Sequence, residues 1–116
     1  MLPRMSNRSL RHASRSTALV FAALGDTTRL KLVSRLNDGE ALSIAQLADG
    51  LHLTRQGVTK HLRVLERAGI VKSASVGRES RFVYVPEQID RARTYLDNVS
   101  AQWDQALSRL KTFVES

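Results

Sequence analysis

The side chains best suited to chemistry lie in one short stretch, residues 54–68, where long hydrogen-bond donors recur at the spacing of a helix. Val58, Leu62 and Leu65 follow one another at intervals of four and three, so they predict a helix held on a core by that side. The opposite side carries five polar or cationic side chains and no acid among them: Gln56, Thr59, Lys60, Arg63 and Arg67. Such side chains suit base edges in a major groove, because Arg and Lys donate to guanine and Gln pairs with adenine.

The start of this helix adds two further candidates. Thr54 is a predicted N-cap, and Arg55 falls in the first turn, where free backbone N–H groups favour a phosphate. His61 lies at the edge of the core-facing side, and two interpretations stay open for it: a hydrogen-bonded histidine that braces the helix, or a contact to phosphate. No metal site is predicted there, because no second ligand stands near His61 in the sequence.

A second group of donors lies in a predicted β-hairpin. Residues 70–76 and 81–85 have the composition of two short strands, joined by a loop over residues 77–80. Arg78 at the tip and Arg81 at the base of this loop are placed to reach a minor groove or flanking phosphates. Phe82 and Tyr84 share one strand face, which favours a place in the core over base stacking.

The positive charge of the chain is concentrated around these donors. The net charge is +7, of which residues 1–16 contribute +4 and residues 54–81 contribute +5, while the remainder sums to −2. Two basic blocks on a near-neutral body indicate a footprint for phosphate. A merely solvated face remains the alternative on charge alone.

Composition excludes several classes of protein. The 116 residues suffice for one domain, and the absence of cysteine excludes disulfides, thiolate metal sites and cysteine nucleophiles. There is no Gly-rich phosphate loop, His-Glu metal motif or Gly-x-Ser-x-Gly, so we do not expect an enzyme. No apolar run reaches the roughly 18 residues of a membrane span, and no signal peptide is evident, so a soluble cytoplasmic chain is expected.

The helices and strands that must position these donors are predicted from the periodicity of apolar residues and from capping and turn residues. Residues 1–15 are predicted to be a basic flexible arm, and residues 16–115 one domain. Helices are expected over 16–24, from Asp26 or Thr27 to about 37, over 54–68 and over 88–114. The second of these carries Leu30, Val33 and Leu36 on one face. A further short helix is expected to begin at a Ser43-x-x-Gln46 capping box. The fold class is therefore mostly α with a small β-hairpin, arranged as a winged helix-turn-helix.

The last predicted helix carries an apolar seam longer than a small core needs. Its members recur every three or four residues: Ile89, Ala92, Leu96, Val99, Trp103, Ala106, Leu110 and Phe113. The seam is roughly 36 Å long at 1.5 Å per residue, so it predicts a homodimer, helped by the first helix. The expected interface residues are Leu19, Val20, Leu96, Val99, Trp103, Ala106, Leu110 and Phe113. Intramolecular packing with a frayed end is the alternative.

Two segments resemble a known family. Residues 23–32, Ala-Leu-Gly-Asp-Thr-Thr-Arg-Leu-Lys-Leu, and residues 53–71, from Leu-Thr-Arg-Gln-Gly-Val to Arg-Ala-Gly-Ile-Val, look like the arsenical-resistance repressor (ArsR) family of bacterial regulators. Gly77-Arg78 with Tyr84 resembles its wing, and the likeness covers about residues 16–114. The resemblance implies a homodimeric winged-helix regulator that binds DNA, usually as a repressor, with dimer contacts through the first and last helices.

One departure from the family bears on cofactors. Many relatives sense metals through Cys-x-Cys at the start of the third helix, where this chain has Ser43-Ile44-Ala45, or through ligands on the last helix, which here contains no histidine. We therefore expect no metal and no cofactor. The expected function is sequence-specific binding of double-stranded DNA at a near-palindromic operator. A winged-helix protein-interaction adaptor is the rival, although such domains usually lose the cationic side that this chain keeps.

Overall fold

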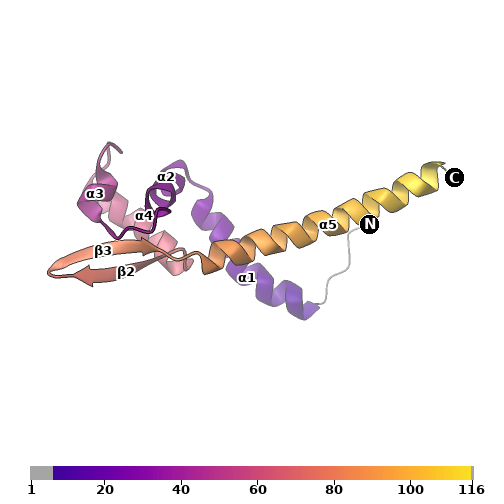
Figure 1. The fold of residues 1–116 in the computed structure, drawn as a ribbon, viewed down its shortest axis with the longest axis horizontal. Coiled ribbons are helices and arrows are strands. Elements are labelled where there is room, and N and C mark those ends of the chain that lie inside the picture. The colour runs from indigo at the N-terminus through magenta and orange to yellow at the C-terminus, as the bar shows by residue number, and fades with distance from the viewer. Residues whose placement is uncertain (1–6, 116) are drawn as a thin grey trace.

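The computed structural model describes residues 7–115, with side chains described from Arg15 onward. It is mostly helical with a small antiparallel sheet, which confirms the predicted fold class (Figure 1). The elements in chain order are α1 (Asn7–Leu24), α2 (Thr27–Leu36), β1 (Leu42–Ser43), α3 (Ile44–Ala48), α4 (Arg55–Arg67), β2 (Val71–Val76), β3 (Glu79–Tyr84) and α5 (Glu87–Glu115). None of the described helices is long and apolar enough to cross a membrane.

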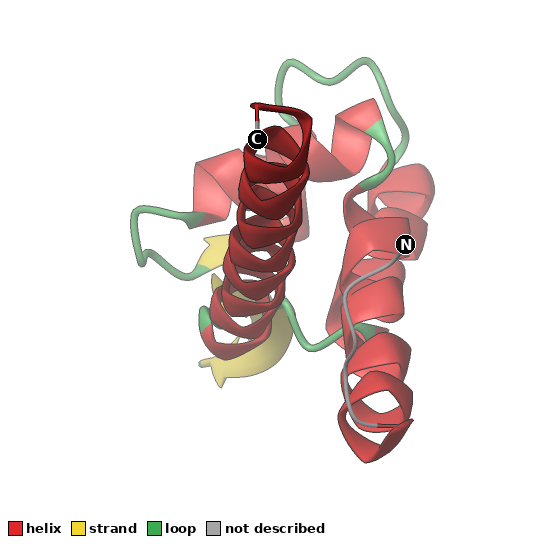
Figure 2. Ribbon diagram, turned by 90° about the vertical axis from the view of Figure 1, so that its right-hand side faces the viewer, coloured by secondary structure: helices red, strands yellow, loops and turns green. Residues whose placement is uncertain are grey.

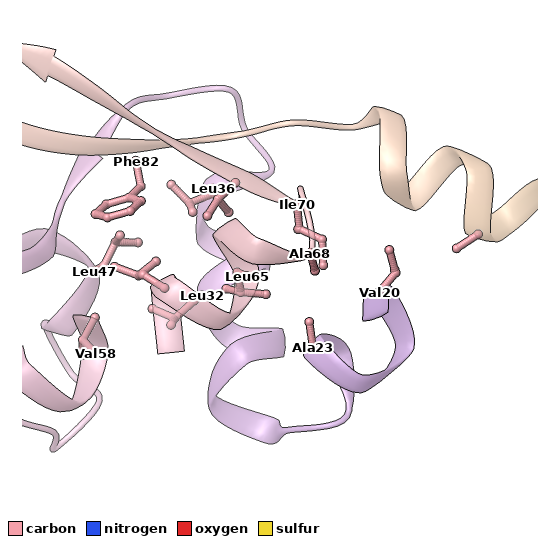
Figure 3. Packing of buried hydrophobic residues seen from close by; sticks show 13 residues of the cluster. Val20, Ala23, Leu32, Leu36, Leu47, Val58, Leu65, Ala68, Ile70 and Phe82 are labelled. Atoms are coloured by element: carbon pink, nitrogen blue, oxygen red, sulfur yellow. The ribbon is translucent and has the colours of Figure 1, made fainter. Parts of the chain in front are cut away.

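One hydrophobic core joins the helices to the sheet. α4 contributes Val58, Leu62 and Leu65, which are fully buried as their spacing predicts. Around them pack Leu32 and Leu36 of α2, Leu47 of α3, Phe82 of β3, and Ile70 just before β2 (Figure 3). Because α4 buries one complete side in this core, its opposite side must face solvent.

Side-chain caps begin the helices where the sequence predicts them. Asp26 caps α2 by accepting from the backbone N–H of Arg29 at 3.0 Å. Ser43 and Gln46 form the predicted capping box of α3, with both hydrogen bonds present. Thr54 caps α4 by accepting from the N–H of Gly57 at 3.0 Å. Each cap satisfies a backbone donor that the first helical turn leaves without a partner.

The sheet differs from the predicted hairpin in two ways. Its strand order is β1-β3-β2, so a third strand, β1, pairs Leu42 with Phe82 and Ser43 with Arg81. The loop between β2 and β3 contains two residues where four were predicted, since Val76 already pairs with Glu79. Gly77 has φ +65°, and glycine at the first of two turn residues suits a tight hairpin of type II′. We call the β2–β3 hairpin the wing.

Two predictions about the first two helices were wrong. α1 begins at Asn7 and not at residue 16, so the predicted start of the first helix was wrong; residues 1–6 of the predicted arm lie outside the described residues. No glycine or proline interrupts residues 7–24, and extending a formed helix costs far less than starting one. In α2 the buried face carries Leu32 and Leu36, while Leu30 is 48% exposed. The Leu32–Leu36 pair keeps the i, i+4 spacing of one face, and Leu30 lies away from it.

α1 and α5 pack against each other beside the core, and the far half of α5 then extends away from the body (Figures 1 and 2). Val20, predicted for the dimer interface, is 1% exposed and shares the protomer's own core with Ala23 and Ala92. That assignment was wrong because α1 covers the start of α5 with this side. Leu19, its neighbour, is 55% exposed and stays available for a partner.

Candidate nucleic-acid interface

The exposed side of α4 carries most of the predicted DNA-binding residues. Arg55, Gln56, Lys60, Arg63 and Arg67 are exposed, and Thr59 is half-buried with its hydroxyl donating to the Arg55 carbonyl at 2.8 Å. We call this side the reading surface. Gly57 lies near it, where an added Cβ would come within 3.3 Å of the Thr54 hydroxyl that caps the helix. The glycine therefore leaves room for the cap.

The six predicted cations of α4 and the wing fall into two groups. Four of them have no recorded ion pair or hydrogen bond from their side chains within residues 7–115: Arg55, Lys60, Arg67 and Arg78. Arg63 instead pairs with Glu66 at 2.7 Å, and Arg81 pairs with Glu79 at 2.9 Å. The free group is available to phosphates and bases without first losing a protein partner.

Arg63 leans from α4 toward the wing. Its guanidinium carbon lies 6.0 Å from the centre of the buried Phe82 ring, at the outer range of a cation–π contact. Glu66, its ion-pair partner, also accepts from the Ser73 hydroxyl of β2 at 2.6 Å. The hydrogen bond from Ser73, followed by that from Arg63, lowers the pKa of Glu66 below its usual value. This network ties the reading helix to the wing.

Arg81 is likewise engaged within the protein. Besides Glu79, its guanidinium donates to the Ala41 carbonyl at 3.2 Å, in the segment that leads into β1. Arg81, predicted to contact DNA from the base of the wing, is therefore bonded to Glu79 and to the backbone of Ala41. Arg78, at the tip, has no such partner in the described chain and is exposed.

A groove separates α4 from the tip of the wing. Its volume is about 510 Å³, and it is open to solvent between the start of α3, the first turns of α4 and the hairpin turn. Arg55 and Arg78 line its two sides, and the hydroxyls of Ser43, Thr59 and Ser80 line it between them. The lining also includes the Glu79 carboxylate, with which Arg81 pairs at 2.9 Å, and the side chains of Ile44 and Ala45. The two unpaired cations at its rim are the groups that suit a phosphate.

His61 faces the interior junction of α1, α2 and α4. Its Nδ1 lies 3.2 Å from Nη1 of Arg29 and 3.7 Å from a carboxylate oxygen of Asp26. This position favours the bracing interpretation over a phosphate contact. Elsewhere in the described part of the chain, no group of three or more His, Asp or Glu side chains is placed to hold a metal ion.

Sequence reasoning missed the acids that occupy Arg63 and Arg81. A local signal existed for both, because Glu66 follows Arg63 by one helical turn and Glu79 lies two residues before Arg81 on the same strand face. It also missed the contact between Arg29 and His61, which are 32 residues apart and carry no such signal.

Known proteins agree with this geometry. A family described as "Helix-turn-helix domain" matches residues 24–74. The HTH-type transcriptional regulator Rv2034 of Mycobacterium tuberculosis is 32% identical over 102 residues, which cover 88% of this chain and 92% of that protein. The structure of an ArsR-like transcriptional regulator from Rhodococcus sp. RHA1 is 34% identical, covers 88% of this chain and 95% of its own, and superposes with a TM-score of 0.79.

The chain belongs to the ArsR family of winged helix-turn-helix regulators. It is a DNA-binding transcriptional regulator, as the reading surface predicts, and its relatives are regulators, not enzymes. A further similar structure is that of CmtR from Mycobacterium tuberculosis, described as a cadmium metal-sensor; it is 36% identical, covers 66% of this chain and 75% of its own, and has a TM-score of 0.52.

Proposed function

We propose that this regulator acts as a homodimeric repressor, in the cytoplasm, that reads a near-palindromic operator with two copies of α4. The observation that carries the proposal is the set of four free cations, Arg55, Lys60, Arg67 and Arg78, which border one exposed surface and its groove. A protein-interaction adaptor would not need this set. Each free cation on DNA releases counterions and adds affinity.

Within this proposal the parts of the surface have different tasks. Gln56, Lys60 and Arg67 point outward from α4 and reach base edges of a major groove. Arg55 and Arg78 face each other across the groove and hold the phosphates of the strand that passes between helix and wing. Arg63 contributes through its hold on the wing, and Arg81 and Thr54 support the local backbone.

The apolar side of α5 supports the homodimer. Beyond its contact with α1, the helix exposes a row of large side chains at spacings of seven, four and three: Leu96, Trp103, Leu107 and Leu110. We call this row the α5 seam. It also includes Val99, Ala106 and Phe113 of α5, and Leu19 of α1. A second copy of the same helix covers such a row by two-fold symmetry. The two reading helices then address half-sites about 34 Å apart.

Selection from a pool of random DNA duplexes tests the proposal. We expect a two-fold symmetric sequence to be enriched, and footprinting to show two protected half-sites one helical turn apart. A reporter gene with this sequence across its promoter should be silenced by the protein, and a reporter with one scrambled half-site should be active. Failure to enrich any sequence, together with capture of DNA-free protein partners, would support the adaptor instead.

A further inference from the structure

Arg29 connects three helices through one guanidinium group. It lies in the first turn of α2, half-buried, and its Nε and Nη2 donate to the carbonyls of Ala23 and Ala22 in the last turn of α1. The last carbonyls of a helix lack the usual partner one turn further on, and the Ala22 carbonyl also accepts from the N–H of Gly25 at 3.3 Å. The third nitrogen, Nη1, lies 3.2 Å from Nδ1 of His61 on α4. The end of α1 is thereby joined to the middle of the reading helix.

A hydrogen bond between Arg29 and His61 forms with only one form of the ring. A guanidinium only donates hydrogen bonds, so Nδ1 of His61 accepts from Arg29 when the ring is neutral with its proton on Nε2. Asp26 also faces the ring, but its carboxylate oxygen is 3.7 Å from Nδ1 and accepts instead from the backbone of Arg29. The charged groups in contact with His61 are thus Arg29 of α2 and Asp26, the N-cap of α2. α1 reaches the cluster through the backbone carbonyls of Ala22 and Ala23. Among the side chains that the structure describes, from Arg15 onward, no other charged group contacts the ring.

We propose that Arg29 is a positioning residue that locks the reading helix to the end of α1, and that neutral His61 completes this lock while protonated His61 opens it. The inference rests on the proposed DNA-reading role of α4 and adds a regulation of that role by pH. Histidine is the side chain that changes its charge between about pH 5 and pH 8.

The opening step is an exchange of partners at one nitrogen. When Nδ1 takes a proton from solvent, it becomes a donor, and the nearby Asp26 carboxylate is its only acceptor among the groups named above. Nη1 of Arg29 then loses its acceptor and faces a second cation at hydrogen-bond distance. Arg29 keeps its bonds to Ala22 and Ala23, so the link that opens is the one between the end of α1 and α4, while α4 stays packed on the core through Val58, Leu62 and Leu65.

The expected sign of the effect separates this lock from ordinary electrostatics. Acidification makes any histidine-containing protein more positive, which strengthens its binding to every DNA sequence. Opening of this link instead weakens only the binding that depends on the orientation of α4. The ratio of affinity for a selected duplex to affinity for a scrambled duplex should therefore fall as the pH falls, and general charge effects cancel from it.

The experiment measures this ratio by fluorescence anisotropy with a duplex that the protein has selected and a scrambled duplex, at about pH 8 and about pH 5.5. For the unmodified protein we expect the ratio to fall roughly five- to tenfold at the lower pH, the range of a modest coupling between sites. His61→Gln offers Arg29 a neutral acceptor at both pH values, so its ratio should stay high and constant. His52→Gln is the matched control, because His52 is exposed in the turn before α4 and should leave the fall unchanged.

Two further variants test the partners. Arg29→Gln should give a low ratio at both pH values, with the mass of the protein in sedimentation unchanged. Asp26→Asn keeps an acceptor for the α2 cap but removes the carboxylate that stabilises the imidazolium, so the fall should move to a lower pH. A ratio independent of pH in the unmodified protein, or a fall that persists in His61→Gln, would overturn the lock. Absence of any preference for the selected duplex at pH 8 would instead contradict the proposed function.

Discussion

Lys60 and Arg63 lie one turn apart on α4 but differ in what surrounds them. Lys60 is exposed with no recorded partner for its ammonium group, whereas Arg63 is bound to Glu66 and leans over Phe82. A side chain without a protein partner gives up only hydration and conformational freedom when DNA binds, while a paired one must also exchange an ion pair for a new contact. The two residues therefore have separable roles in the same interface.

Lys60→Ala should weaken binding to the selected duplex by roughly 1–3 kcal/mol if Lys60 contacts a base, with specificity relaxed at one position. If it contacts a phosphate, all sequences should lose affinity and the salt dependence should fall by about one counterion. Competition titrations at several salt concentrations distinguish the two. Lys72→Ala on β2, which also removes one exposed lysine, should leave both quantities nearly unchanged. Unfolding of the Lys60→Ala protein would show that Lys60 does not lie on an outward face.

Glu66 links stability to pH. Its pKa is lowered in the folded protein, first by Ser73 and then by Arg63, so the folded state binds fewer protons than the unfolded chain. The stability that it adds is present at neutral pH and is lost as the pH falls below the ordinary value of 4.5 and through the lowered one. Because both partners are partly exposed, this contribution is at most about 1 kcal/mol.

Glu66→Gln should thus be slightly less stable than the unmodified protein at pH 7, and the difference should disappear in acid. Urea unfolding measured across the pH range checks this. A difference that stays constant into acid would mean that the carboxylate charge plays no part. Glu40→Gln, at an exposed carboxylate with no recorded ion pair, should show no such difference.

Local patterns predicted the helical elements well. The caps at Asp26, Ser43 and Thr54 act within three residues of themselves, so their types and spacing identify them without knowledge of the fold. β1 could not be predicted in this way, because it has two residues and its partner strand lies about 40 residues further along the chain. The early start of α1 was missed because polar residues extend a helix without any apolar periodicity.

The start of α3 also carries a prediction about metals. Ser43 and Ala45 occupy the positions at which the family resemblance leads us to expect thiolates in metal-sensing members, and the chain contains no cysteine. We expect zinc, cadmium or arsenite at equimolar amounts to leave the affinity for the selected duplex unchanged, because no ligand set for them is predicted. Anisotropy titrations with and without a chelator measure this. Release of DNA near one equivalent of metal would contradict it.

At the scale of the whole molecule, α5 makes the protomer elongated, about 67 Å along its longest axis. The periodicity of the α5 seam was readable from the sequence, and Leu96, Trp103, Leu107 and Leu110 are exposed in the described protomer. Which surface covers it could not be read, because a helical pattern states which side is apolar and not what packs on it. Val20 illustrates the same limit. Its apolar side chain was assigned to the interface between copies, but it packs in the core of its own protomer.

Trp103→Ala should dissociate the proposed dimer in part at micromolar concentration. Trp103 is 39% exposed on the seam of the lone protomer, and removing an aromatic side chain from a buried interface costs about 3–5 kcal/mol. Affinity for the selected duplex should fall as well, although no residue of the reading surface has changed. Sedimentation of both proteins is the measurement, and Gln105→Ala, an exposed polar residue of the same helix, is the control. An unmodified protein that is already monomeric would place the seam outside any interface between copies.

The short strand β1 has a consequence for the length of the operator. Its pairs Leu42–Phe82 and Ser43–Arg81 attach the start of α3 to the middle of the wing, and the Arg81 bond to Ala41 reinforces the attachment. These contacts fix the position of the wing relative to the start of α3 in the described structure. One base pair inserted between the bases under α4 and the phosphates under Arg78 would displace the latter by about 3.4 Å along the duplex and rotate them about its axis. If the proposed contacts of α4 and Arg78 hold, we expect the protein to discriminate between half-sites by their internal spacing as well as by their sequence.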